Sequence, residues 1–435
     1  MKCAVINILV ILFLLVPLGT FHQATAFVNN NEIYTPEELF DEDFEEEILI
    51  KMEDAKIPSS AVSVIHNNKS VYMKGFGEQS DVDISYSLAS ISKTFVATAV
   101  LQLYDKGLIN LDDSINDYLP YIVRHPDYPN QNITFKQLLS HTSGLVGAHA
   151  TLGSLLLNKS LSFPDILYDV LNENGSYYST DFFVTAPGTT YIYTNLGFDL
   201  LAYLVQLISN QSYEEYLNEY IFGPLSMTHS FVNVSNYPHD LIAIPYDFDE
   251  SSGSYTTYDI QTKLSIGGGG VFSSVSDLTP YLIAHMNNGS VNGVSILNES
   301  TIQSMHDGHS DMGRHGFGWF YSLKMVSDPL IRTTGHDGRS EGARTYLFYS
   351  PAPRIGVIYL TNNGYHSTTN QNAWLGKNKL LYEFIFDTAL MINQPKSETD
   401  PDATERAGFS IYLPIVALTI ALIPIIRRRR RGKKN

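Results

Sequence analysis

The stretch SLASISKTF, residues 87–95, contains a serine and a lysine three positions apart, Ser90 and Lys93. Residues with this spacing share one face of a helix, so the hydroxyl and the amine would lie side by side. Burial and the positive end of a helix lower the pKa of a lysine, and a neutral amine can accept the proton of a serine. A serine activated by an adjacent base attacks carbonyl carbons and forms acyl intermediates.

This spacing alone does not decide the chemistry. A chain of this size contains about one S-x-x-K sequence by chance, given average serine and lysine contents. Ser90 also fits a plain helix N-cap, because serine often precedes the first turn of a helix.

The elements that must position these residues begin with a hairpin and a helix. Residues 60–77 alternate in polarity around Asn67 and Asn68, a pattern that is typical of two paired strands. The helix that follows Ser90 is expected to end near Lys106, before Gly107.

Further along the chain, helical patterns fill residues 108–265 and recur at 276–287. Four strand-like stretches then precede a closing helix over 373–391. Because strands lie at both ends of this body and helices fill its middle, we expect an α+β fold. It would comprise one antiparallel β-sheet flanked by helices, with an inserted, mostly helical subdomain.

Six further phrases follow the serine stretch in a fixed order: LLSHTSGL (138–145), PGTTYIYTNLGFDLLAYLV (187–205), FGPLSMTHS (222–230), GGVFSSVSDL (269–278), GFGW (316–319) and GHDG (335–338). Together they resemble serine β-lactamases of class C, penicillin-binding proteins and their esterase and peptidase relatives. The resemblance covers roughly residues 45–390. It implies a β-lactamase/transpeptidase-like fold in which Ser90 is the nucleophile and Lys93 is its base.

The same family has a Y-x-N element, and three stretches match it. Tyr128-Pro129-Asn130 lies in a turn, and Tyr216-Leu217-Asn218 lies within a helical pattern. Only Tyr193-Thr194-Asn195 follows PGTT and starts a helix, as the family's element does. The resemblance therefore implies that Tyr193 holds or relays the serine proton and that Asn195 binds the amide or ester flank of the substrate.

The third family element is K-T-G in lactamases and often H-x-G in the esterase-like branch. Of the two HDG triplets, 306–308 ends a helical pattern, whereas 336–338 ends the strand-like LIRTTG. We choose the second, because a strand beside the serine must present its backbone to the substrate, and Gly338 permits close approach. The resemblance also implies an oxyanion hole formed by the N–H groups of Ser90 and Arg339. Because His336 replaces the lysine and is largely neutral near pH 7, an esterase, amidase or peptidase is favoured over a β-lactamase.

No cofactor or metal is expected. His306 and His309 are spaced like metal ligands, but a third ligand is not evident in the sequence, and a solvated turn fits them better. The run GGGG at 267–270 is not followed by G-K-[ST], so it does not predict a phosphate-binding loop. The single cysteine, Cys3, leaves none for a nucleophile or a disulfide in the body of the chain. We interpret His141 as structural.

Both ends of the chain predict membrane targeting. Residues 1–26 have the layout of a secretory signal peptide, with Lys2, an apolar run and small residues before the cleavage site. Residues 407–426 carry no charge and are long enough for a transmembrane helix, and the arginine-rich residues 427–435 would stay in the cytoplasm. A processed C-terminal sorting tail is the alternative, although an LPxTG-like sequence does not precede the run.

The predicted organisation is therefore a signal peptide, an acidic lead-in at 27–44, a catalytic domain at 45–392, a polar stalk at 393–406, a transmembrane helix and a basic tail. The predicted location is a single-pass cell-membrane protein with its catalytic domain outside the cytoplasm. Eight sequons fit an extracellular glycoprotein, and they begin at Asn68, Asn132, Asn158, Asn174, Asn210, Asn233, Asn288 and Asn298.

Charge also restricts the partners. Eight of the 28 basic residues are Lys2 and those of the C-terminal tail, which leaves 20 basic against 45 acidic residues elsewhere. So acidic a surface argues against nucleic acid as a partner. The sequence thus predicts a membrane-anchored serine hydrolase that acts on a small-molecule or peptide-like acyl substrate. A D-amino-acid-specific peptidase or transpeptidase, a β-lactamase and a non-catalytic surface-binding domain remain alternatives, and the sequence does not determine the oligomeric state.

Overall fold

The centre of the molecule is a six-stranded antiparallel sheet with the strand order β2-β1-β12-β11-β10-β9. The computed structural model describes residues 33–147, 162–249, 251–260, 264–309, 314–322, 326, 331–365 and 371–396. The sheet strands are β1 (Ser59–His66), β2 (Lys69–Gly77), β9 (Phe320–Ser322), β10 (Thr333–Ser340), β11 (Ala343–Ser350) and β12 (Ile355–Thr361).

The predicted hairpin is formed by β1 and β2. Its two loop residues, Asn67 and Asn68, both have positive φ angles, 51° and 63°. A two-residue hairpin loop with this backbone favours asparagine, because asparagine tolerates the left-handed region better than most residues. The local sequence therefore determines where the chain reverses.

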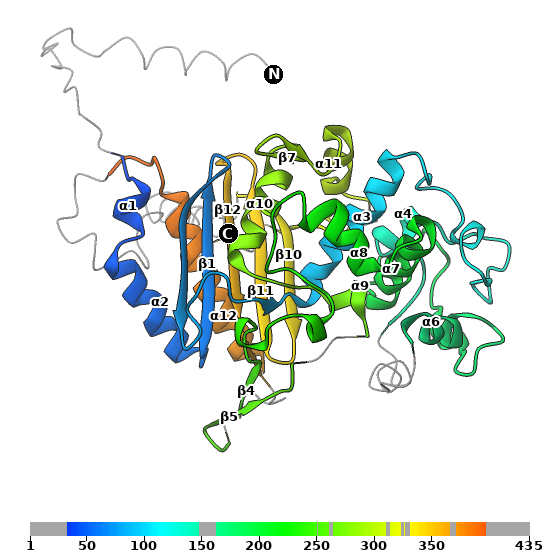
Figure 1. Ribbon diagram of the computed structural model, residues 1–435, viewed down its shortest axis with the longest axis horizontal. Helices are drawn as coiled ribbons and strands as arrows, with labels where there is room; N and C mark the ends of the chain where they lie inside the picture. Colours follow the sequence, from blue (N-terminus) through cyan, green and yellow to red (C-terminus); the bar gives the residue numbers. More distant parts are fainter. Residues whose placement is uncertain are drawn as a thin grey trace, which may run out of the picture.

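Side chains along each strand point alternately to the two faces of the sheet. Each face therefore has its own hydrophobic core. In β11, Tyr346 and Phe348 pack with α12, whereas Leu347 and Tyr349 pack against the helices of the opposite face. Figure 1 shows the sheet between these two layers. The first layer consists of α1 (Pro36–Leu39), α2 (Glu42–Asp54) and α12 (Gln371–Leu390).

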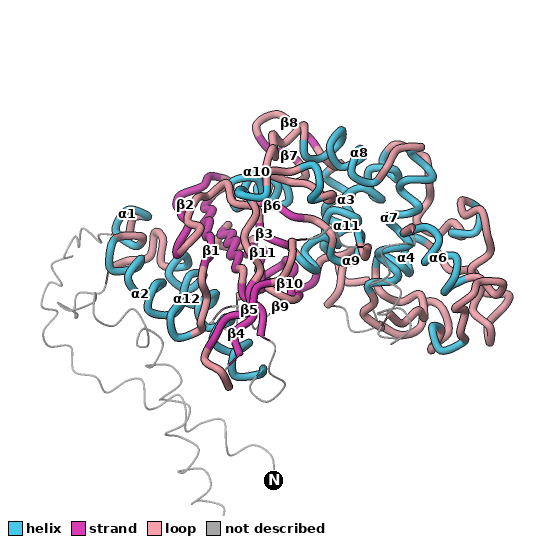
Figure 2. Tube along the Cα trace, turned by 60° about the horizontal axis from the view of Figure 1, so that its bottom comes forward, coloured by secondary structure: helices cyan, strands magenta, loops and turns pink. Residues whose placement is uncertain are grey.

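The second layer is the helical subdomain, which is inserted between β2 and β9 in the sequence. Figure 2 shows most of its helices grouped beside the sheet, while α10 (Val275–Met286) lies against the strands. The α+β fold with an inserted helical subdomain is therefore confirmed. Its helices are α3 (Ser92–Asp105), α4 (Phe135–Leu139), α6 (Phe163–Leu171), α7 (Asn195–Ser209), α8 (Tyr213–Leu217), α9 (Ile266–Gly269), α10 (Val275–Met286) and α11 (Glu299–His306).

Smaller strands border the main sheet. A hairpin of β4 and β5 extends from the lower end of the sheet in Figure 1, and β13 pairs with β4 in parallel. The remaining pairs are β3 with β6 and β7 with β8. Their bounds are β3 (Tyr86–Ser87), β4 (Tyr246–Asp249), β5 (Ser254–Thr257), β6 (Phe272–Ser273), β7 (Ser290–Val291), β8 (Val294–Ser295) and β13 (Asn363–Tyr365).

The C-terminal transmembrane helix and the single-pass membrane location need correction. A membrane-spanning helix needs about 20 predominantly apolar residues. Across the described part of the chain, no helix meets both conditions of length and apolarity. The 20-residue α12 carries charges such as Lys379 and Glu383, and the other described helices have 15 residues or fewer. Residues 407–426 themselves lie outside the described residues, so the structure gives the predicted helix no support.

Other predicted segments also fall outside the described residues. These are the signal peptide at 1–26, the basic tail at 427–435 and the stalk beyond residue 396. Within the predicted lead-in at 27–44, α1 and the start of α2 pack on α12. The domain boundary at residue 45 remains a prediction.

Candidate active site

Ser90 lies in a short 3₁₀ turn, η2 (Ala89–Ile91), directly before α3. Ala89 has a φ of +47°, a conformation that costs energy for a residue with a side chain and is concentrated at functional sites. Two hydrogen bonds hold the preceding residue in place: Leu88 N donates to Val271 O over 3.0 Å, and Thr345 Oγ1 donates to Leu88 O over 3.0 Å. The turn is thereby fixed from both the helical side and the sheet side.

Lys93 lies in the first turn of α3, and its side chain is fully buried. Its Nζ lies 3.1 Å from Ser90 Oγ and donates to Gly268 O over 2.6 Å. Burial lowers the pKa of Lys93 to about 7, although the negative charges of Asp199 and Asp337 act in the opposite direction. A substantial fraction of the amine is therefore neutral near pH 7 and able to accept a proton.

Tyr193 lies close to both the Lys93 amine and the Ser90 hydroxyl. Lys93 Nζ is 4.8 Å from the centre of the Tyr193 ring, and the phenol is hydrogen-bonded to the Ser90 side chain. Burial raises the pKa of Tyr193, while the bond to Ser90 acts in the opposite direction. As a residue, Tyr193 is still 40% exposed, so part of its side chain or backbone is open to solvent.

Asn195 is the first residue of α7 and is exposed, two positions after Tyr193. Its side chain packs directly on α9, since a Cβ on Gly268 would lie 2.8 Å from Asn195 Cβ. The glycine run at 267–270 therefore lets α9 approach the start of α7. The structure brings Asn195 close to the backbone group that binds Lys93.

The second HDG triplet lies within β10, on the part of the strand that borders Ser90. Residues 333–335 of β10 pair with β9, whereas 336–340 pair only with β11 among the described residues. Gly338 packs against η2, because a Cβ on it would lie 2.2 Å from Leu88 O and 3.2 Å from Ala89 Cβ. The triplet was predicted to end the strand, and the strand continues beyond it to Ser340 because β11 pairs along the whole triplet and the two residues after it.

His336 is buried in this free edge, and burial lowers its pKa to about 4, with the charge of Lys93 acting in the same direction. Its Nδ1 lies 2.5 Å from Asp337 O. Because a carbonyl oxygen can only accept, Nδ1 carries the proton and Nε2 is left as an acceptor. His336 is therefore a neutral imidazole without a free N–H.

Arg339 is exposed and follows Gly338 on the strand. The peptide between them is fixed by a residue that the sequence analysis missed, Arg344 of β11. Arg344 Nη1 donates to Gly338 O over 3.0 Å and to Asp337 Oδ2 over 2.6 Å. The Gly338 carbonyl and the Arg339 N–H belong to one peptide group, so this bond polarises the N–H that faces away from Arg344.

Asp199 of α7 is a second residue that was missed. It is 2% exposed, and its Oδ1 accepts hydrogen bonds from Gly267 N and Gly268 N over 3.0 and 2.8 Å. Burial raises the pKa of Asp199, whereas these bonds and the charge of Lys93 act in the opposite direction. One sequence signal could have revealed it, because it is the only charge in the apolar run NLGFDLLAYLVQLI.

His141 is buried below Tyr193, with ring centres 4.5 Å apart. Its Nδ1 accepts a hydrogen bond from Thr194 N over 3.2 Å. Burial lowers the pKa of His141 well below its usual value, so the ring is a neutral acceptor. It supports the segment that carries Tyr193 and Asn195.

The structure thus brings Ser90, Lys93, Tyr193, Asn195 and the 336–339 segment of β10 to one place. The competing matches lie elsewhere in other packing roles. Tyr128 contacts the ring of His125, and Tyr216 is buried on α8 beside Lys106.

The two histidines at 306 and 309 point to different partners. His306 binds Tyr349, whereas His309 Nε2 lies 2.6 Å from Ser304 O. Each of these two histidines therefore has a different hydrogen-bond partner.

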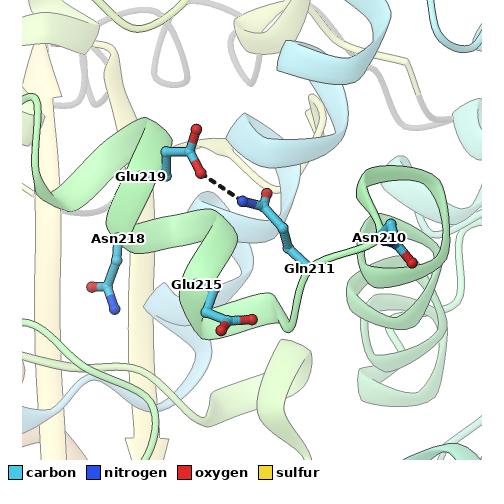
Figure 3. A pocket seen from close by; sticks show the side chains of 5 residues that line it. All are labelled: Asn210, Gln211, Glu215, Asn218 and Glu219. Atoms are coloured by element: carbon cyan, nitrogen blue, oxygen red, sulfur yellow. Dashed lines mark hydrogen bonds between the residues drawn. The ribbon is translucent and has the colours of Figure 1, made fainter.

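A separate surface pocket lies beyond the C-terminal end of α7 (Figure 3). Gln211 Nε2 donates to Glu219 Oε2 across it over 2.5 Å. A 15-residue helix is about 22 Å long, so this pocket is far from Asn195 at the other end of α7. Its lining offers only carboxylates and amides, namely those of Asn210, Gln211, Glu215, Asn218 and Glu219.

Known proteins resemble this chain in sequence and in fold. Protein flp of Staphylococcus aureus (strain MW2) is 24% identical over 319 residues, which are 70% of this chain and 60% of flp. The chain thus spans less than two thirds of that relative's length.

Two solved structures have the same fold. The octameric penicillin-binding protein homologue from Pyrococcus abyssi has a TM-score of 0.62 at 24% identity, and the alignment covers 80% of this chain and 77% of that one. The D-amino acid amidase from Ochrobactrum anthropi SV3 complexed with D-phenylalanine has a TM-score of 0.63 at 18% identity, covering 79% and 99%. The family profile described as Beta-lactamase matches residues 44–379, which confirms the resemblance seen in the sequence. The chain therefore belongs to the Beta-lactamase family.

Proposed function

We propose that the protein is a serine hydrolase that cleaves an ester or an amide through an acyl-enzyme on Ser90. The observation that supports this most directly is the fully buried Lys93 amine, 3.1 Å from Ser90 Oγ. A lysine is a useful base only when its pKa is close to the working pH. Its pKa of about 7 meets that condition.

In the proposed reaction, Ser90 Oγ attacks the carbonyl carbon while Lys93 accepts the hydroxyl proton. Collapse of the tetrahedral intermediate breaks the bond to the leaving alcohol or amine, which receives that proton through Tyr193. Water then attacks the acyl-enzyme, the acid is released, and Ser90 recovers its proton. The hydrogen bond between the Tyr193 phenol and Ser90, with the ring centre 4.8 Å from the Lys93 amine, supports this relay.

The oxyanion would bind to the N–H groups of Ser90 and Arg339. Two features support this assignment: residues 336–340 lack a second strand partner within the described residues, and Gly338 lets β10 approach η2 closely. One such donor contributes about 2.7–4 kcal/mol to the transition state. Asn195, exposed beside the amine, would bind the flank of the scissile group.

The substrate would be neutral where it meets His336. Since Nε2 of His336 is an acceptor and burial keeps the ring neutral, this residue repels a carboxylate rather than binding it. This favours an ester or amide over a β-lactam, whose carboxylate the family's lysine would bind. A D-amino-acid-specific peptidase or transpeptidase and a β-lactamase are retained as alternatives, as is a non-catalytic surface-binding domain on the same fold.

Labelling of the full-length chain with a fluorophosphonate probe tests catalysis. We expect one probe per chain, located on Ser90 by peptide mass, and Ser90→Ala should abolish it. Ser92→Ala is the matched control from the same stretch, and it should retain labelling because Ser92 is buried and accepts from Val271 N. Absence of labelling in the wild type, or persistence in Ser90→Ala, would contradict the proposal.

A substrate panel then separates the hydrolase alternatives. It contains p-nitrophenyl esters, D-amino acid amides and nitrocefin. We expect turnover of esters or amides and little or none of nitrocefin. Efficient nitrocefin hydrolysis would instead identify a β-lactamase and would contradict the role assigned to His336.

A further inference from the structure

The buried carboxylate of Asp199 has no role in the reaction proposed above. It lies in α7, one helical turn after Asn195, among buried neighbours that include Phe198 and Leu200. A buried carboxylate is costly unless it is paired or fully hydrogen-bonded. The hydrogen-bond partners of Asp199 should therefore indicate what role the carboxylate has.

Those partners all belong to the start of α9. Oδ1 of Asp199 accepts from Gly267 N and Gly268 N, and Ser265 Oγ donates to Oδ2 over 2.8 Å. Ser265 occupies the N-cap of α9 but makes no capping bond with its own side chain. Asp199 thus supplies from α7 the acceptor that the first turn of α9 lacks.

The same turn holds the catalytic amine. Gly268 donates its N–H to Asp199, and its carbonyl accepts from Lys93 Nζ over 2.6 Å. This second bond fixes one N–H of the amine and so directs the lone pair of neutral Lys93 toward Ser90. The carboxylate and the amine are therefore linked through one glycine residue.

Close packing makes this link rigid. A Cβ on Gly267 would lie 2.2 Å from Phe198 O, and one on Gly268 would lie 2.5 Å from Ser265 Oγ. The backbones of α7 and α9 therefore meet at Gly267, and at Gly268 a Cβ would also lie 2.8 Å from Asn195 Cβ. This close approach accounts for the first two glycines of the GGGG run.

We propose that Asp199 is a positioning residue: through Gly268 it orients the Lys93 amine toward Ser90, and its charge stabilises the ammonium that forms when Lys93 accepts the serine proton. This inference rests on the proposed function. It adds a residue that touches neither the substrate nor the nucleophile and acts through the base.

The charges around Lys93 single out Asp199 for this role. Asp337 already forms an ion pair with Arg344, whereas Asp199 is bonded to neutral donors. Desolvation makes an uncompensated ammonium at Lys93 unfavourable, so an unpaired carboxylate nearby is valuable. The ionisable groups that face Lys93 are His141 after α4, Tyr193 before α7, Asp199 in α7, and His336 and Asp337 in β10.

The variant Asp199→Asn separates charge from geometry. Its Oδ1 can still accept both backbone bonds, and Nδ2 can donate to Ser265, but the negative charge is gone. Asp277→Asn is the matched control, because Asp277 is also buried, also accepts from a backbone N–H (His229) and a serine (Ser230), and is not among the groups that face Lys93.

The measurement is kcat/KM for a p-nitrophenyl ester as a function of pH, with the melting temperature of each variant. In the wild type, activity should fall below about pH 7 as Lys93 becomes protonated. Loss of the opposite charge lowers the pKa of Lys93, so Asp199→Asn should move this acid limb down by about one pH unit. Asp277→Asn should leave it in place. Asp199→Ala also loses the bonds to α9 and should cost about 100-fold in kcat/KM.

An acid limb of Asp199→Asn that coincides with those of the wild type and Asp277→Asn would overturn the inference while the proposed function stands. If the wild type shows neither labelling nor turnover, the proposed function fails, and the pKa of Lys93 is then read directly. For that, the ¹³Cε resonance of Lys93, assigned by its loss in Lys93→Met, is titrated by NMR. A lower pKa in Asp199→Asn than in the wild type supports the role of Asp199, and equal values overturn it.

Discussion

The triplet His-Asp-Gly occurs twice in this chain, at 306–308 and at 336–338, and the two copies have different surroundings. The first copy begins at the last residue of α11, and the second lies within β10 beside Ser90. In both, burial strongly lowers the pKa of the histidine, to about 3 for His306 and about 4 for His336. A perturbed histidine therefore does not by itself identify the active site.

The difference lies in what each histidine can reach. Both ring nitrogens of His306 are engaged: Nε2 lies 3.3 Å from His285 Nδ1, and Nδ1 lies 2.8 Å from Tyr349 OH. His336 uses one nitrogen on its own strand and lies near Tyr193, with ring centres 6.2 Å apart. His306 belongs to a closed packing cluster, whereas His336 lies where β10 borders Ser90 and pairs only with β11 among the described residues.

The third residues of the two triplets, Gly338 and Gly308, give the largest expected contrast in activity. Gly338→Ala would place a Cβ 2.2 Å from Leu88 O, so the turn that carries Ser90 or the edge of β10 must move. A displacement of about 1 Å at a catalytic group can cost about 100-fold in rate, and we expect that loss in kcat/KM for ester hydrolysis. Gly308 is exposed, and Gly308→Ala should stay within about twofold of the wild type. Melting temperatures serve as the folding control, and equal rates for both variants would show that β10 does not constrain the site.

The sequence was sufficient to assign each triplet to its element. The strand-like LIRTTG precedes residue 336 and a helical pattern ends at residue 306, as the structure has them. The same kind of reasoning predicted the β1–β2 hairpin, the helix after Ser90 and the flanking helix α12. Ser90 and Lys93 could be paired because their contact is local, three residues along one helical face.

Contacts between distant segments could not be predicted in this way. Asp199 meets Gly268 across 69 positions, and Lys93 meets Gly268 across 175. The extension of β10 beyond Gly335 depends on its pairing with β11, and the role of Arg344 depends on the same register. No local sequence pattern predicts contacts between residues so far apart in the chain. They become visible only once the sheet and the helices are packed together.

The second residues of the two triplets, Asp337 and Asp307, give a smaller expected contrast in activity. Arg344 joins Asp337 to Gly338 O, whereas Asp307 is exposed. Arg344→Lys keeps the positive charge but loses the planar group, whose Nε donates to Tyr346 OH over 3.0 Å and so holds Nη1 in place between its two acceptors. We expect kcat and kcat/KM to fall together by about tenfold, because the Arg339 N–H would meet the oxyanion only in the transition state. Asp307→Asn should leave both unchanged, and an unaltered kcat in a folded Arg344→Lys protein would argue against the polarised peptide.

The first residues of the two triplets, His306 and His336, give the smallest expected contrast in activity. Replacement of His306 should have a clear effect on the free energy of unfolding. His306 stays neutral in the folded protein down to about pH 3, whereas in the unfolded chain it binds a proton below its ordinary pKa of about 6.5. The unfolded state therefore binds more protons in this window, and the free energy of unfolding falls as the pH is lowered. One such group contributes about 1.4 kcal/mol per pH unit, which His306→Asn should remove.

Urea unfolding between about pH 4 and pH 7 measures this slope. The buried histidines His141 and His336 remain in both proteins, so the change in slope belongs to His306 and to its direct neighbour His285. Ester hydrolysis by His306→Asn at about pH 8 should stay within about twofold of the wild type, whereas His336→Asn should lower it, because only His336 faces the reacting groups. Loss of hydrolysis in a stably folded His306→Asn protein would mean that the closed cluster is coupled to the active site, and the division between the two triplets would then be wrong.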